Sequence, residues 1–87
     1  PSAGFVIEEG RMDNIHPTTR IVFVYLRDTI AEHGIPPNIR QISDAAYIGR
    51  STVYRHLDRL EAWGWIEREP GMARGIRLTQ RGRDASI

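Results

Sequence analysis

The hydrophobic period of this chain changes once, at Gly64, and that change limits the folds it can adopt. Before Gly64, apolar residues recur every three or four positions, as they do along one face of a helix. After it, Trp65–Glu69 and Gly75–Thr79 alternate apolar and polar residues around a Pro70-Gly71 turn, which predicts a β-hairpin. A chain of 87 residues supports one hydrophobic core, so we expect the helices and the hairpin to share it.

The first predicted helix runs from Pro17 to Gly34. Proline fits the first helical position because its missing N–H is not needed there, and glycine readily ends a helix in the left-handed conformation. Phe23 lies at the edge of the expected core stripe and Val24 on the opposite side, so this helix shows more apolar surface than one core face needs. Phe5–Ile7 or a second subunit would cover it. The stripe itself comprises Val22, Tyr25, Leu26, Thr29 and Ile30.

Two further helices are predicted after the Pro36-Pro37 pair, which forbids helix. The second covers about Ile39–Ala46, with Asn38 as its cap and Gln41 completing a capping box. The short turn Tyr47–Gly49 leads to the third helix, which ends at Gly64 and directs one face to the core through Val53, Leu57 and Leu60. Three helices followed by a ribbon predict a mainly α fold with a small β-hairpin, the three-helix winged helix-turn-helix.

This domain is expected over residues 17–79, between an arm (residues 1–16) and a polar tail (residues 80–87) that frays. Met12 is compatible with a start codon, which would make the residues before it foreign to the natural chain. The longest apolar run, Ile21–Leu26, is short of the roughly 20 residues that cross a bilayer. No secretory signal opens the chain, and we expect a cytoplasmic location.

Positive charge gathers in the second half of a chain whose net charge is only +1. All twelve basic residues are arginine, a preference that suits phosphate and guanine but that codon bias in a GC-rich genome also explains. From Gly49 to Arg83 there are eight arginines and four acids, and from Gly71 to Arg83 four arginines and no acid. This asymmetry is typical of a nucleic-acid footprint; the alternative is an ordinary solvated surface.

The side of the third helix that faces away from the core is the candidate DNA-reading surface, because a helix fits the major groove of DNA. Arg55 can bond O6 and N7 of a guanine together, and Asp58 could hold its guanidinium in position. Arg50 and Ser51 stand at the helix start, where free amides favour phosphate. Tyr54 would contact a thymine methyl or a phosphate, and Arg59 lies on the same outward side.

The hairpin supplies a second candidate contact. Arg74, at or near its tip, could enter the neighbouring minor groove or grip the backbone, with Arg77 behind it. Contacts of this kind fix the register of a protein on DNA more than they read sequence.

The segments RDTIAEHGIPPNIRQI, STVYRHLDRLEAWGWIERE and ARGIRL resemble the amino-terminal DNA-binding domain of LexA-type SOS repressors, over about Pro17 to Leu78. The resemblance implies a winged-helix transcriptional repressor domain that reads operator DNA. On the matching stretch of the recognition helix stand Arg50, Ser51, Thr52, Tyr54 and Arg55.

Two departures from the family accompany the resemblance. The turn between the second and third predicted helices is one residue shorter than in the family. Tyr47 stands where helix-turn-helix proteins commonly have glycine. A bulky residue at positive φ would be strained, so we expect another turn conformation. The family's second half is a self-cleaving peptidase with a Ser and Lys pair, and this chain has no lysine. It is then either an excised domain or a small regulator that forms a homodimer through helix 1 and the arm.

The sequence thus predicts a sequence-specific double-stranded DNA-binding regulator, and specifically a repressor. The alternative is a winged-helix protein-interaction module, although acids would then be expected in place of Arg50, Arg55 and Arg59. The sequence contains no pairing of a nucleophile with a general base that would indicate an enzyme. The three histidines lack metal-ligand spacing, so neither a metal nor a cofactor is expected; one of the two tryptophans should pack beneath the hairpin.

Overall fold

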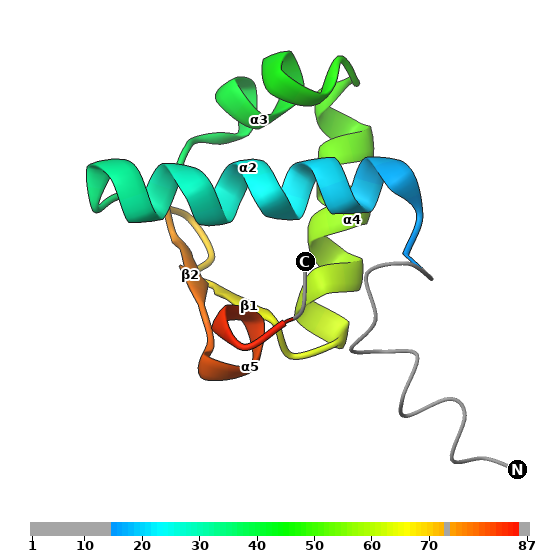
Figure 1. The fold of residues 1–87 in the computed structure, drawn as a ribbon. Coiled ribbons are helices and arrows are strands. Elements are labelled where there is room, and N and C mark those ends of the chain that lie inside the picture. Colours follow the sequence, from blue (N-terminus) through cyan, green and yellow to red (C-terminus); the bar gives the residue numbers. More distant parts are fainter. Residues whose placement is uncertain (1–14, 73, 86–87) are drawn as a thin grey trace, which may run out of the picture.

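Three helices and a two-stranded hairpin follow one another along the chain (Figure 1). The computed structural model describes residues 15–72 and 74–85. In chain order, the elements are α2 (Pro17–His33), α3 (Ile39–Ala46), α4 (Arg50–Ala62), β1 (Ile66–Arg68), β2 (Ile76–Leu78) and α5 (Gln80–Arg83). The strands pair antiparallel, with Ile66 opposite Leu78 and Arg68 opposite Ile76. The predicted winged helix-turn-helix is therefore confirmed.

Helix α2 has the predicted ends. Pro17 is its first residue, the Nδ1 atom of His16 accepts from the Thr18 N–H at 3.1 Å, and Gly34 ends it at φ 77°. Its buried face differs from the predicted stripe, because Phe23 is fully buried while Tyr25, Thr29 and Ile30 are only partly so.

Phe23 is covered by the base of the hairpin. Its ring packs against that of Trp65, with centroids 5.0 Å apart, and Trp65 is the tryptophan buried beneath the hairpin. The chain itself therefore covers the apolar edge for which Phe5–Ile7 or a second subunit was expected, and Phe5–Ile7 lie outside the described residues. The core lies between the helices and the hairpin and comprises Ile15, Val22, Phe23, Leu26, Ile42, Val53, Leu57, Leu60, Trp65, Ile66 and Ile76.

Helix α3 begins with the predicted capping box. The Asn38 side chain accepts from the Gln41 N–H at 2.8 Å, and the Gln41 side chain accepts from the Asn38 N–H at 2.9 Å. The two reciprocal bonds fix the first turn of α3.

The turn after α3 keeps the left-handed conformation, and the expectation of another conformation is wrong. Tyr47 has φ 57° and ψ 45°, and its backbone N–H bonds to the Ser43 carbonyl. The Ser43 hydroxyl donates to the Ile48 carbonyl and holds the turn from the other side. The Tyr47 side chain is 94% exposed, so it meets no neighbour, and the strain is confined to a backbone cost of about 1 kcal/mol.

Helix α5 occupies part of the predicted tail, so the expectation that residues 80–87 fray is wrong for Gln80–Arg83. The Thr79 hydroxyl accepts from the Gly82 N–H at 3.0 Å and caps the helix. A Cβ at Gly82 would lie 2.2 Å from the Trp65 carbonyl oxygen, so only glycine allows this approach. The short helix thereby closes the base of the hairpin.

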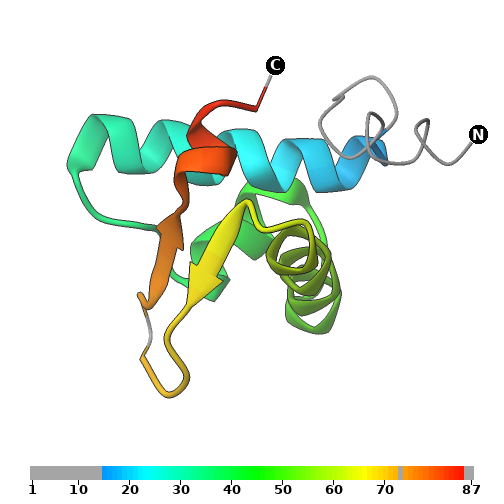
Figure 2. The same ribbon diagram turned by 90° about the horizontal axis from the view of Figure 1, so that it is seen from below.

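The hairpin extends away from α2, beside α4, as Figure 2 shows from below. We call the hairpin with its loop, residues 66–78, the wing. Among the described helices, none combines the length and the apolarity that a bilayer crossing requires.

Candidate nucleic-acid interface

Helix α4 packs on the body of the domain with one side and exposes the other. Val53, Leu57 and Leu60 are fully buried, as predicted. Because these residues fix the orientation of the helix, the opposite side faces solvent. It exposes Arg50, Ser51, Tyr54 and Arg55, while Thr52 is partly buried.

The first turn of α4 has no side-chain cap. Gly49 is the N-cap residue, and its carbonyl accepts from the Thr52 and Val53 N–H groups at 3.1 and 3.0 Å. The amides of Arg50 and Ser51 precede these bonds, at the positive end of the helix dipole. An anion such as a phosphate fits this end of the helix.

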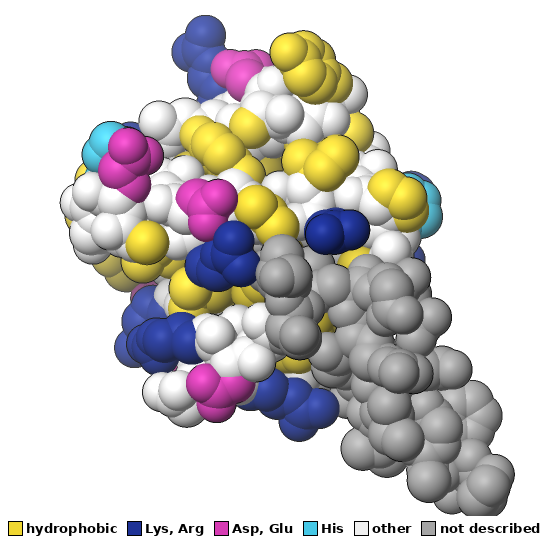
Figure 3. Space-filling view, viewed as in Figure 1, with side chains coloured by type: hydrophobic (Ala, Val, Ile, Leu, Met, Phe, Trp, Pro, Cys, Tyr) yellow, Lys and Arg dark blue, Asp and Glu magenta, His cyan; other side chains and the backbone are white. Residues whose placement is uncertain are grey.

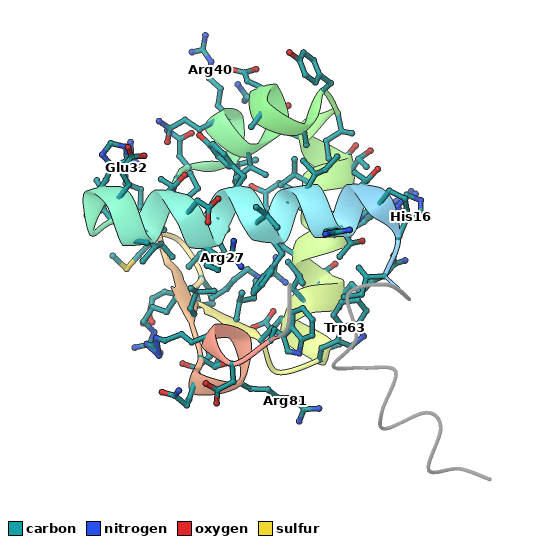
Figure 4. All side chains as sticks on the ribbon, viewed as in Figure 1. His16, Arg27, Glu32, Arg40, Trp63 and Arg81 are labelled. Atoms are coloured by element: carbon teal, nitrogen blue, oxygen red, sulfur yellow. The ribbon has the colours of Figure 1, made fainter. Side chains whose placement is uncertain are left out.

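Arg50 and Arg55 hold no protein partner within the described part of the chain, although both are exposed. Asp58, expected to hold the Arg55 guanidinium, instead forms an ion pair with Arg68 of β1. That expectation is therefore wrong, because Arg68 of the wing, rather than Arg55 of the same helix, binds the Asp58 carboxylate. A further exposed arginine, Arg40, projects from α3 away from α2 (Figure 4).

Arg59 turns back toward α2, although it lies on an exposed part of α4. Its Nη1 donates to the Thr19 hydroxyl at 3.3 Å, and the same hydroxyl lies 2.7 Å from Nδ1 of His56. His56 is 8% exposed and is therefore buried. Burial, followed by the positive charge of Arg59 and then that of His16, lowers the pKa of His56 below its ordinary value. The imidazole is therefore neutral at pH 7 and ties α4 to α2.

The wing arginines that the sequence assigns to DNA are bonded to the protein. Arg74 donates from Nη1 to the Pro36 carbonyl at 2.9 Å and to Oε1 of Gln41 at 3.2 Å. Arg77 donates from Nη2 to Oε1 of Glu67 at 2.6 Å. Both side chains remain exposed, and each guanidinium has five N–H donors, of which these bonds use only some. No local pattern marks the contact of Arg74 with the α2–α3 connection, since the partners stand far apart in sequence.

Arg68 is a residue that sequence reasoning missed. Its Nε and Nη2 both donate to Oε1 of Glu61, at 3.0 and 2.7 Å, and Nη2 also donates to Oδ1 of Asp58. Burial acts to lower the pKa of Arg68, but the hydrogen bonds and negative charges of Asp58 and Glu61 outweigh it and raise the pKa above its ordinary value. This cluster joins the wing to α4.

A groove of about 650 Å³ lies between α4 and the wing. Leu57 and Ile76 are among its apolar lining residues, as are Tyr54 and Met72, which are 49% and 63% exposed. Glu61, Arg68 and Glu69 supply its charged groups. The groove therefore separates the two candidate DNA-contacting elements with a mostly apolar surface.

On the opposite face of the molecule, which carries α2, the described side chains form no patch of a single sign. Figure 3 shows acidic and apolar side chains standing among basic ones over this helix. A phosphate backbone favours a surface of one sign, so α4 and the wing are the better candidates.

Comparisons with known proteins show the family of the chain. The family model described as LexA DNA binding domain matches residues 12–75. LexA repressor 2 of Pseudomonas putida is 39% identical over 70 residues, which cover 79% of this chain and 35% of that protein. The LexA repressor of Pediococcus pentosaceus is 36% identical over 73 residues (83% and 35%), and that of Lactobacillus johnsonii 41% over 64 residues (72% and 30%). The chain thus spans about a third of the length of these curated relatives.

Proposed function

The chain belongs to the LexA DNA-binding domain family, and from this membership we propose that it binds specific sequences of double-stranded DNA and represses transcription there. The observation that carries the proposal is the exposed start of α4, where Arg50 and Arg55 have no partner among the residues that the structure describes. In the proposed complex, α4 lies in the major groove and the wing on the adjacent backbone or minor groove.

The exposed side of α4 divides into reading and anchoring groups. Arg55, one turn into the helix, bonds a guanine through its two-pronged guanidinium. Arg50, Ser51 and Thr52 hold a phosphate together with the free amides of the first turn. Tyr54, half exposed beside the groove, contacts a thymine methyl or a phosphate.

The remaining arginines are proposed to contact the DNA backbone without reading sequence. Arg59, Arg74 and Arg77 keep N–H donors beyond those bound to the protein, so each can hold a phosphate while its protein partner orients it. Each such contact would steepen the slope of log affinity against log salt concentration by about 0.9.

A regulatory role without catalysis follows from this proposal, as the relatives are named repressors. A protein that acts on chromosomal operators works where the chromosome is, so we place this one in the cytoplasm.

We further propose that two copies bind a two-fold operator, because one winged helix covers only one half-site. Ile21 on α2 is 49% exposed and Val24 partly so, which leaves apolar surface for a homodimer contact. Val24→Asp should abolish association in sedimentation while the helical circular dichroism persists. An unchanged sedimentation profile would place the dimer contact elsewhere.

The test of DNA reading begins with selection of bound duplexes from a random pool at two salt concentrations. On the selected duplex, Arg55→Ala should lower the preference for one base pair roughly 5- to 150-fold, as the loss of a bidentate contact predicts. Arg74→Ala should weaken all duplexes alike. Arg83→Ala, an exposed residue of α5 with the same change of charge, is the control.

Two outcomes would contradict the proposal. If the chain does not bind duplex DNA even in dilute buffer, it is not a DNA-binding protein. Equal losses on every sequence for Arg55→Ala would mean that Arg55 touches only the backbone.

A further inference from the structure

The cluster of Arg68 with Asp58 and Glu61 lies outside the set of residues proposed to contact DNA. Asp58 and Glu61 are three residues apart on α4 and therefore neighbours on its surface. Arg68 reaches them from the end of β1, and its side chain is only 24% exposed, while those of Asp58 and Glu61 are 66% and 42% exposed. The carboxylates are thus the outer part of the cluster and the guanidinium its inner part.

The position of these carboxylates matters for a helix that binds DNA. Asp58 is four residues and Glu61 seven residues after Tyr54, so all three share the side of α4 that faces the wing. Tyr54, Glu61 and Arg68 line the same groove. Two unneutralised carboxylates here would stand beside the phosphate backbone that runs between the major-groove helix and the wing, and they would repel it.

We propose that Arg68 is a positioning residue for DNA binding: it acts as the counter-ion of Asp58 and Glu61 and prevents these recognition-helix carboxylates from repelling the phosphate backbone. The inference rests on the proposed function. Arg68 acts through the carboxylates in this proposal, since its Nε and Nη2 are both bonded to them.

A contribution to stability alone is the competing explanation. Ion pairs with exposed partners contribute little to stability, since solvent screens them and side-chain entropy opposes them. The effect on stability should therefore be small, whereas the change of charge beside a bound phosphate should be felt directly in affinity.

The experiment is a double-mutant cycle on the affinity of the chain for its selected duplex. Arg68→Met should weaken binding about tenfold, the scale of charge repulsion at several ångströms near a protein surface. In the Asp58→Asn, Glu61→Gln background, the same substitution should change affinity by less than about twofold, because no carboxylate remains to be neutralised. Arg68→Lys, which keeps the charge without the planar fork, should restore binding to within about threefold of the natural chain.

Two controls separate this effect from general causes. Arg83→Met removes one positive charge from α5. Within residues 15–72 and 74–85 no carboxylate pairs with Arg83, so the change should alter affinity less than about twofold, because salt screens distant charges. Thermal unfolding of each variant checks that binding is measured on folded protein. Arg68→Gln replaces Arg68→Met if the latter does not fold, and the same loss is expected.

The inference is overturned if Arg68→Met binds as tightly as the natural chain. It is also overturned if the loss is equally large without the two carboxylates, since Arg68 would then contact the phosphate itself. If the natural chain binds no duplex at all, the proposed function fails and this inference with it; in the first two outcomes the proposed function stands.

Discussion

The first two turns of α4 and the wing both carry arginines, yet they use them in opposite ways. In α4, Arg50 and Arg55 are exposed and hold no partner within the described residues. In the wing, Arg68, Arg74 and Arg77 each bond to a carboxylate, a carbonyl or an amide of the protein. Whether a guanidinium is available to DNA thus depends on the hydrogen-bond partners that the fold places near it. The wing arginines are bonded to the protein and hold the wing in place.

The largest expected effect concerns the base of the wing. Gly82→Ala should lower the free energy of unfolding by about 3 kcal/mol, because the new Cβ would collide with the Trp65 backbone, which cannot turn aside as a side chain could. Gly49→Ala, at the start of α4, is the matched control: its Cβ would meet nothing within 4 Å, and its φ of −72° suits alanine. Chemical denaturation measures both. Similar losses at the two sites would show that the wing base is not tightly packed.

A second prediction compares one arginine from each region in the absence of DNA. Arg74→Ala should destabilise the domain by about 1 kcal/mol, the usual contribution of hydrogen bonds of this kind. Arg55→Ala should leave the unfolding free energy within about 0.5 kcal/mol of its original value, as is normal at exposed sites without partners. Denaturant titrations measure both unfolding free energies. A larger loss for Arg55→Ala than for Arg74→Ala would contradict the distinction between the two regions.

The protein-facing side of α4 should respond to pH through His56. Its pKa is lowered in the folded state, so between pH 6.5 and that lower pKa the unfolded chain binds more protons than the folded one. The contribution of His56 to stability is therefore complete above pH 6.5 and falls as pH decreases from there toward the lowered pKa. Melting temperatures at pH 7.5 and 5.5 measure the change.

His56→Gln should remove this pH dependence, whereas His33→Gln, at the exposed end of α2, should keep it. An identical dependence in both variants would assign it to other groups.

The smallest expected effect lies in the turn before α4. Tyr47→Gly should raise stability by about 0.5 kcal/mol, because glycine adopts the left-handed conformation without strain but loses more entropy on folding. Tyr47→Ala removes the ring and keeps the strain, so it should give no such gain. A stability scan that ranks alanine above glycine would contradict the assignment of strain to the backbone.

The contrast between the two regions also separates what the sequence predicts from what it does not. Helix ends followed from local signals such as Pro17, Gly34 and the Asn38 cap, and each is present. The exposed start of α4 followed from its buried opposite face. These features depend on neighbours a few residues away, which a sequence displays directly.

Features set by partners far apart in the chain could not be predicted from the sequence. Phe23 is buried because the hairpin folds back onto α2, and Arg68 binds α4 because β1 runs beside that helix. Arg74 has its acceptor at the α2–α3 connection, and α5 forms where Gly82 fits beneath Trp65. No local pattern distinguishes an arginine that reaches across the fold from one that faces solvent.

The most direct test is a map of backbone amide chemical shifts on addition of the selected duplex. The largest shifts should fall on Arg50 to Arg55 of α4, with smaller ones in the wing. A map in which α2 responds most, while the start of α4 stays unchanged, would show that the domain meets its partner with a different surface.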